Sequence, residues 1–168
     1  MATITLKGSP IHTVGSLPAV GGKAPAFRLT RADLSDVGLD VFAGKKKILN
    51  IVPSLDTSVC ALSAQAFSRE VAGLADTVLL NISADLPFAQ ARFCESHKLT
   101  NMVTLSVFRS PAFGKDYGVL ITDGPLAGLL SRAVLVLDKD NRVIHAQQVP
   151  EIAQEPDYAA ASAAVRKA

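Results

Sequence analysis

The sequence has few cysteines, little net charge and no long apolar run, and each shortage excludes a class of protein. Only two cysteines occur in 168 residues, Cys60 and Cys94. Such a pair is typical of catalysis or redox chemistry in a reducing compartment, rather than of a disulfide-stapled scaffold. The formal net charge of +2 is too small to indicate nucleic-acid binding. The lysine run at residues 45–47 predicts only a solvated strand edge.

Segments that would direct the chain to or across a membrane are also missing. Residues 2–20 lack the charged start and the continuous apolar stretch of a secretory signal. No segment reaches the ~18 uninterrupted apolar residues that a membrane span requires. We therefore expect a cytoplasmic protein that binds neither membrane nor nucleic acid.

Apolar residues, in contrast, are plentiful. They make up 49% of the chain, against 19% charged residues, which excludes a largely disordered protein. A chain of this length can bury a sizeable core without disulfides or metals, and its size is typical of one compact domain. We therefore expect a single domain over residues 1–168.

The pattern of apolar residues predicts an α/β fold. Alternating or β-branched runs predict strands at residues 3–7, 11–14, 27–30, 48–52, 77–84, 102–106, 133–137 and 143–147. Helical spacing, a first-turn proline or alanine-rich composition predicts helices at residues 58–75, 87–97, 112–117 and 157–167. Strands that alternate with helices in the middle imply a parallel pair with a right-handed crossover, and the last two strands imply an antiparallel hairpin. A mixed central sheet flanked by helices, with an N-terminal β-hairpin at the domain's edge, matches the thioredoxin-like layout.

Cys60 is placed by this pattern in the first turn of a helix, directly after a buried strand. First-turn amides have no acceptor within the helix and the dipole leaves partial positive charge there, so a thiolate is favoured over a thiol. Thr57 can direct its hydroxyl at the sulfur, and Pro53 stiffens and shields the approach. A small buried hydrophobe at a helix start is the alternative. The polar, proline-stopped loop before Cys60 favours the reactive thiolate.

Two motifs resemble those of a known family. The spacing of Pro53, Thr57 and Cys60, with three and two residues between them, is similar to the active-site signature of the peroxiredoxins. Residues 81–90, followed by Arg92-Phe93-Cys94, resemble the stretch around the second cysteine of the bacterial thiol peroxidases, which are atypical two-cysteine peroxiredoxins. The similarity extends to residues 34–37, 123–126 and 155–158.

This resemblance implies a thioredoxin fold and a catalytic role for Cys60. The cysteine attacks the terminal oxygen of a hydroperoxide, either hydrogen peroxide or an organic one, and becomes a sulfenic acid. Thr57 and the amides of Val59 and Cys60 are candidate donors to the reacting oxygens. Arg132 matches the family's active-site arginine, and arginine suits the role because it stays protonated and offers a rigid fork of donors. Without the resemblance, Arg132 is an arginine flanking a strand, in competition with Arg92 and Arg109.

The resemblance also implies partners for Cys60. Cys94 resolves the sulfenic acid as an intrachain disulfide, and thioredoxin reduces that disulfide again. A homodimer interface helps to build the substrate pocket, with Leu55, Leu86 and Phe88 near its mouth beside Val59. Taken alone, Cys94 is also explained as a helix cysteine packed next to Phe93. If the two helices must loosen before the sulfurs meet, we expect two backbone conformations in the two redox states.

Other functions find less support in the sequence. His12, His97 and His145 are far apart and the cysteines lack ligand spacing, so we expect no metal and no other cofactor. A thioredoxin-type disulfide oxidoreductase needs Cys-x-x-Cys, but position 63 is serine. A redox sensor that passes its oxidation to a partner protein uses the same thiolate and stays open as the alternative. A structural or chaperone-like role has only the high apolar content in its favour.

Overall fold

The computed structural model describes all 168 residues of the chain. Its elements in chain order are β1 (Thr3–Leu6), β2 (Ser9–His12), β3 (Leu29–Thr30), β4 (Asp36–Val37), the 3₁₀ helix η1 (Leu39–Phe42), β5 (Lys46–Ile51), α1 (Ser58–Val71), β6 (Thr77–Ser83), α2 (Pro87–Ser96), β7 (Met102–Ser106), α3 (Ala112–Asp116), β8 (Ala133–Leu137), β9 (Val143–Gln148) and α4 (Tyr158–Lys167). None of the helices is long and apolar enough to cross a bilayer.

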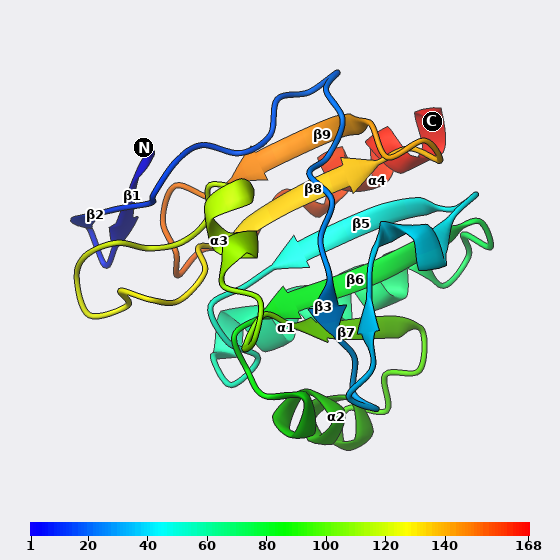
Figure 1. Cartoon of the computed structure of the whole chain (residues 1–168), viewed down its shortest axis with the longest axis horizontal. Coiled ribbons are helices and arrows are strands. Elements are labelled where there is room, and N and C mark those ends of the chain that lie inside the picture. Colours follow the sequence, from blue (N-terminus) through cyan, green and yellow to red (C-terminus); the bar gives the residue numbers. More distant parts are fainter.

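Seven strands form one mixed sheet in the order β4-β3-β7-β6-β5-β8-β9. The neighbours β5, β6 and β7 run parallel, since α1 and α2 connect them, whereas β8 is antiparallel to β5 and β9 to β8. The antiparallel pair β1 and β2 forms a separate hairpin at one end of the molecule (Figure 1). The predicted thioredoxin-like fold, with its mixed sheet and N-terminal hairpin, is confirmed.

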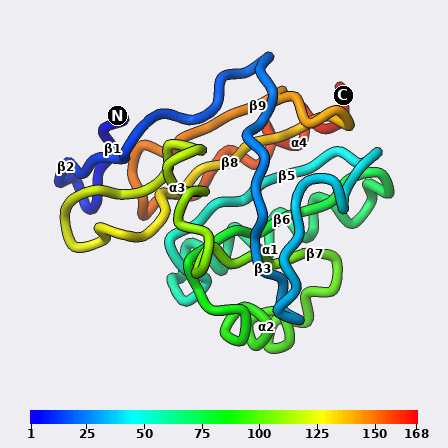
Figure 2. The backbone as a smooth tube through the Cα atoms, in the orientation of Figure 1, coloured from blue at the N-terminus to red at the C-terminus, as the bar shows by residue number.

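The two faces of this sheet pack against different parts of the chain. Along β5, Ile48 points to one face and Leu49 and Ile51 to the other, because side chains alternate along a strand. The helices α1, α2 and α4 cover the first face, where Phe67 is fully buried. The second face is covered by α3, which contributes Phe113, by η1 and by the segment that runs from the hairpin to β3 (Figure 2).

Most of the predicted elements are confirmed to within about two residues at each end, and α1 is the clearest exception. It ends at Val71 rather than at residue 75. The amide of Ala72 already bonds to the carbonyl of Arg69, three residues back, and Gly73 follows at once. Glycine is unfavourable in the interior of a helix, so α1 ends here, although Leu74 continues the apolar spacing of the helix.

The prediction that residues 45–47 form a solvated edge is wrong for two of the three lysines. Lys46 and Lys47 belong to β5 and are 8% and 0% exposed. Their ammonium groups are not left without partners: Lys46 Nζ donates to the Val165 carbonyl at 2.9 Å and Lys47 Nζ to Asn141 Oδ1 at 2.7 Å. Long aliphatic stems let both lysines join the sheet while their charged ends reach polar atoms at its border.

Candidate active site

The segment that carries Cys60 begins where the central strand β5 ends. Residues 52–57 form the loop, and Thr57 is the N-cap of α1, with extended backbone at φ −88° and ψ 145°. Its hydroxyl oxygen accepts a hydrogen bond from the Cys60 amide at 3.3 Å and donates to the Ser54 carbonyl, also at 3.3 Å. Cys60 therefore stands in the first turn, as the sequence predicts. The Cys60 amide donates to the side chain of the N-cap residue, whereas the amide of Val59 has no acceptor inside the helix.

A cavity of about 240 Å³ opens at this end of α1. Four of the residues singled out in the sequence line it together: Pro53, Thr57, Val59 and Arg132. Ser54 and Ser58 of the same segment complete the local wall, and the rest is apolar and comes from distant parts of the chain: Leu6, Leu126, Leu129, Ile152 and Ala153. Cys60 is itself 0% exposed and packs in the core cluster with Leu55 and Phe67, so the cavity wall next to it is formed by its first-turn neighbours Ser58 and Val59 and not by the thiol.

Arg132 reaches the cavity because of the strand register. Ala133 of β8 pairs with Ile51 of β5, so the residue before Ala133 lies beside the loop that follows β5. Arg132 is only 2% exposed, and its Nε donates to the Ile152 carbonyl at 2.8 Å. Its Nη1 atom is buried without a hydrogen-bond partner. A buried guanidinium with a free N–H, on the wall of a cavity, is a ready site for oxygen or negative charge.

Cys94 lies on α2 and is partly buried, and both cysteines are free thiols. Burial raises the pKa of the Cys94 thiol, because a thiolate loses hydration there. In the folded helix Cys94 is therefore a weak nucleophile. The two thiols come from the first turn of α1 and the last turns of α2, two separate and intact helices.

Three residues expected near the pocket mouth lie outside this cavity. Leu55 is 3% exposed and packs in the core cluster that contains Cys60. Leu86 and Phe88 stand at the start of α2, 53% and 66% exposed, because the first turn of that helix faces solvent. In a single chain they line no part of the cavity next to Val59.

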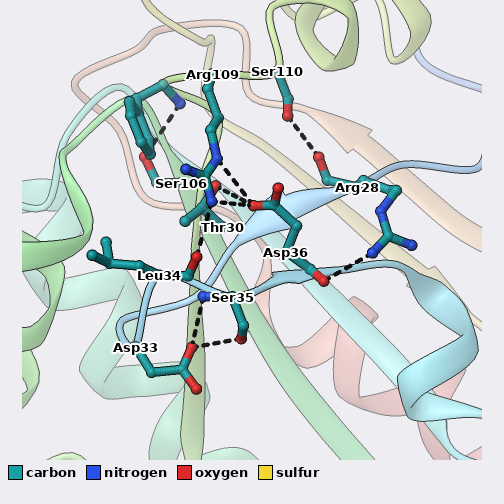
Figure 3. A network of polar contacts seen from close by, with 10 residues as sticks. Arg28, Thr30, Asp33, Leu34, Ser35, Asp36, Ser106, Arg109 and Ser110 are labelled. Carbon is teal, nitrogen blue, oxygen red and sulfur yellow. Dashed lines mark hydrogen bonds and ion pairs between the residues drawn. The ribbon is translucent and has the colours of Figure 1, made fainter.

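The competing arginines are also placed elsewhere. Arg92 is exposed on α2. Arg109 forms an ion pair at 2.8 Å with Asp36, whose carboxylate also accepts a hydrogen bond from Thr30 (Figure 3). This network fastens the β3–β4 hairpin to the loop after β7, and the Arg109 side chain lowers the pKa of Asp36 through the hydrogen bond that it donates. Arg132 is therefore the one predicted arginine that lines the cavity.

The sequence reasoning missed the part of the wall that comes from far away in the chain. Leu6 arrives on the N-terminal hairpin, Leu126 on the loop after α3, and Ile152 on the loop after β9. Ile4 and Ile11 of the hairpin pack with Ile121 and Ile152 in a small core of their own. The alternating pattern of the hairpin predicts buried isoleucines, but no local pattern indicates which distant loop they contact.

Glu151 anchors this hairpin over the cavity. Its carboxylate accepts hydrogen bonds from the Thr5 hydroxyl at 2.6 Å and from the amides of Lys7 and Gly8 at 3.0 and 3.1 Å. These donors, the Thr5 hydroxyl first, lower the pKa of Glu151 to about 2. The carboxylate must therefore be ionised for the hairpin to be held fully.

Acid should weaken this anchor, because protonation of Glu151 removes the negative charge that its hydrogen-bond donors stabilise. Because the folded state lowers the pKa of Glu151, the contribution is complete above the ordinary value of 4.5 and is lost as the pH falls toward about 2. We expect Glu151→Gln to lower the melting temperature at neutral pH and to lower it much less near pH 3. Thermal unfolding at both pH values measures this. Glu95→Gln, at an exposed carboxylate, is the control, and an equal deficit at both pH values contradicts the assignment.

A thioredoxin-like sheet with a cysteine in the first turn of α1, and a buried arginine with a free N–H on the wall of the cavity at that end of the helix, is typical of a redox-active thiol protein. Comparison with known proteins narrows this class. Residues 19–162 match the family model described as Redoxin. The thiol peroxidases of Mycobacterium bovis and Mycobacterium tuberculosis are each 54% identical over 165 residues, which covers 98% of this chain and 99% of theirs.

Solved structures agree with the sequence relatives. A peroxiredoxin-like protein from Aquifex aeolicus superposes with a TM-score of 0.91 at 39% identity, over 99% of this chain and 97% of that one. A thiol peroxidase from Chromobacterium violaceum gives a TM-score of 0.92 at 26% identity, over 98% and 95% of the two chains. The chain therefore belongs to the Redoxin family, and within it to the thiol peroxidases, the group of peroxiredoxins that act as thiol-dependent peroxidases.

Proposed function

We propose that Cys60 is the residue that reduces the hydroperoxide. Its thiolate attacks the terminal oxygen of R–O–OH, so that an S–O bond forms while the O–O bond breaks. The departing R–O⁻ takes up a proton and leaves as an alcohol, or as water when the substrate is hydrogen peroxide. The sulfur is oxidised by two electrons to a sulfenic acid.

One observation carries this proposal: the partnerless Nη1 of Arg132 on the wall of the cavity at the N-terminus of α1. Negative charge moves from sulfur to oxygen during the attack, and a fixed cation with a free N–H stabilises both ends of that movement. Thr57 supplies a second donor when its hydroxyl turns from the Ser54 carbonyl toward a bound oxygen. Pro53 has no amide hydrogen and holds one wall rigid. The mostly apolar lining favours organic hydroperoxides.

We further propose that Cys94 resolves the sulfenic acid. Its sulfur attacks the Cys60 sulfur, an S–S bond forms, and the hydroxyl leaves as water with a proton that comes from the Cys94 thiol. Disulfide-bonded residues have Cα atoms about 4.4–6.8 Å apart, which two intact helices on separate segments do not favour. The ends of α1 and α2 therefore unwind in the oxidised state, and this also frees Cys94 from the burial that keeps it protonated.

Reduction of the disulfide requires an external dithiol, and thioredoxin is the reductant that we propose. It donates two electrons and returns both cysteines to thiols in the cytoplasm. We also propose a homodimer, because Leu86, Phe88 and Phe108 are large apolar side chains that stay 53%, 66% and 44% exposed in the single chain. A second copy on this side brings such residues close to the substrate.

Replacing Cys94 by serine separates the two chemical steps. We expect Cys94→Ser to reduce about one equivalent of hydroperoxide per chain at an undiminished rate and then to stop, because the sulfenic acid has no partner thiol. Rapid mixing with measurement of the peroxide that remains tests this, and mass spectrometry identifies the oxidation state of Cys60. Continued turnover of Cys94→Ser with thioredoxin as the only reductant contradicts the role of Cys94.

A redox sensor is the second candidate, because it would use the same two sulfurs. Continuous consumption of peroxide by the unmodified chain with thioredoxin, thioredoxin reductase and NADPH supports the enzyme. A single stoichiometric oxidation that stalls with this system, and restarts only with another partner protein, supports the sensor. NADPH absorbance distinguishes the two in one experiment.

A further inference from the structure

Asp85 lies between the two cysteine segments, although it belongs to neither. It follows β6 and precedes α2, and its carboxylate accepts hydrogen bonds from three donors. The Ser54 hydroxyl donates to Oδ1 at 2.6 Å, and the Leu55 amide and the Ser83 hydroxyl each donate to Oδ2 at 2.7 Å. No cation pairs with this carboxylate. It is half-buried, so hydrogen bonds alone replace the lost water.

From Asp85, hydrogen bonds continue to Cys60. Ser54, which donates to Asp85, accepts from Thr57 through its carbonyl, at 3.3 Å from both the Thr57 amide and the Thr57 hydroxyl. Thr57 in turn accepts from the Cys60 amide at 3.3 Å. The carboxylate therefore fixes the loop whose last residue caps the helix, and so fixes the first turn that presents the sulfur.

On the other side, hydrogen bonds continue to the helix of Cys94. The Ser83 hydroxyl accepts from Gln90 Nε2 at 3.1 Å, and the same nitrogen donates to the Leu105 carbonyl at 3.1 Å. Gln90 is fully buried and lies four residues before Cys94, one turn away on the same side of α2. The carbonyl of Asp85 is itself held by the Ser106 hydroxyl of β7 at 2.5 Å.

We propose that Asp85 is a positioning residue that latches the Cys60 loop to the base of α2. While its three bonds are made, the first turn of α1 stays wound and holds Cys60 next to the cavity-lining residues Thr57 and Val59. The carboxylate holds Ser54 and Leu55 of the Cys60 loop on one side and, through the Ser83 hydroxyl, Gln90 of α2 on the other, so the latch couples movements of the two cysteine segments. This inference rests on the proposed roles of Cys60 and Cys94. It adds that Asp85 sets the balance between attack on peroxide and formation of the disulfide.

The substitution Asp85→Asn tests the latch by keeping the shape and losing the charge. An asparagine carries no charge and offers one acceptor oxygen instead of two, so its bond to the Leu55 amide, which can only donate, is weaker, and the serine hydroxyls must rotate to accept from its NH₂ group. We expect attack of Cys60 on peroxide, measured in the Cys94→Ser background, to slow about tenfold, the effect of losing a charge-assisted hydrogen bond. We expect disulfide formation in the Asp85→Asn chain to become several-fold faster, because the unwound state is more populated.

Rapid quenching with alkylation and mass spectrometry measures both steps, because sulfenic acid, disulfide and sulfinic acid differ in mass. The fraction of Cys60 that reaches sulfinic acid at high peroxide should fall, since a faster disulfide step competes with further oxidation. A globally unfolded fraction of the chain lowers the apparent rates of both steps alike, whereas a loosened loop in a folded chain changes the two rates in opposite directions. Ser54→Ala is a milder second variant, which keeps the carboxylate and should shift both rates in the same directions by a smaller factor.

The matched control is Asp116→Asn, because Asp116 is an exposed carboxylate at the end of α3 without a hydrogen-bond partner. Asp116→Asn should leave both rates unchanged. If Asp85→Asn slows both steps alike, or changes neither, the latch is wrong while the proposed function stands. Turnover by a chain without Cys60 overturns the proposed function instead. In the double variant Ser54→Ala/Asp85→Asn, the change in the free energy of activation of each step should be smaller than the sum of the changes in the two single variants. Both substitutions remove the same hydrogen bond, between the Ser54 hydroxyl and Asp85.

Discussion

Replacing Cys60 by serine is expected to reduce peroxide consumption to the uncatalysed background. A serine hydroxyl stays protonated in the same first helical turn and cannot form the S–O bond that the reaction requires. The whole acceleration is then lost, which for enzymes is on the order of 10⁶-fold or more. Peroxide consumption with the thioredoxin system measures the effect, with the unmodified chain at equal concentration beside it.

The Cys60→Ser chain should stay folded, which makes the result interpretable. Cys60 is fully buried among apolar residues such as Phe67, and serine is only slightly smaller. We expect a loss of stability of about 1–3 kcal/mol, since the new hydroxyl is buried there. Circular dichroism should show unchanged secondary structure. Residual turnover in a folded Cys60→Ser chain, clearly above background, refutes the central role of this residue.

The fold could be predicted from the sequence because its elements are encoded locally. In β5 the alternation of Ile48 and Leu49 toward opposite faces follows from a continuous apolar run, and Pro87 marks the start of α2 by fitting its first turn. The errors come from competition between local signals. Gly73 ends α1 although the apolar spacing continues beyond it. Lys47 is buried in β5 because its ammonium group donates a hydrogen bond to Asn141, 94 positions away in the sequence.

The candidate site could be predicted only in the part that one motif contains. Pro53, Thr57 and Cys60 lie within eight residues, so the strand-to-helix turn alone brings them together. The sequence points to Arg132 only through the resemblance of the chain to the family, and the physical cause of its position is the pairing of β8 with β5. Asp85 belongs to the motif at residues 81–90, yet its proposed role depends on the distances to Ser54 and Leu55, which no sequence spacing reveals.

Replacing Arg132 is expected to have the second-largest effect on catalysis. In Arg132→Gln the cavity loses its fixed positive charge and the free N–H of Nη1. The rate of Cys60 oxidation should fall by about 10²–10³-fold, as when a donor to developing negative charge is removed elsewhere. Arg132→Lys keeps a charge but offers no rigid fork, so its rate should lie between those of Arg132→Gln and the unmodified chain. Single-turnover oxidation of Cys60 measures these rates.

A structural role of Arg132 must be separated from its catalytic role, because its Nε also holds the Ile152 carbonyl at 2.8 Å. Loss of that bond alone should cost about 1 kcal/mol of stability, which thermal unfolding detects. Alkylation by iodoacetamide provides the decisive comparison, since it needs the Cys60 thiolate but has no oxygen–oxygen bond to break. Arg132→Gln should slow alkylation far less than it slows peroxide reduction. Equal losses with both reagents would mean that Arg132 acts only on the thiol and not on the substrate oxygens.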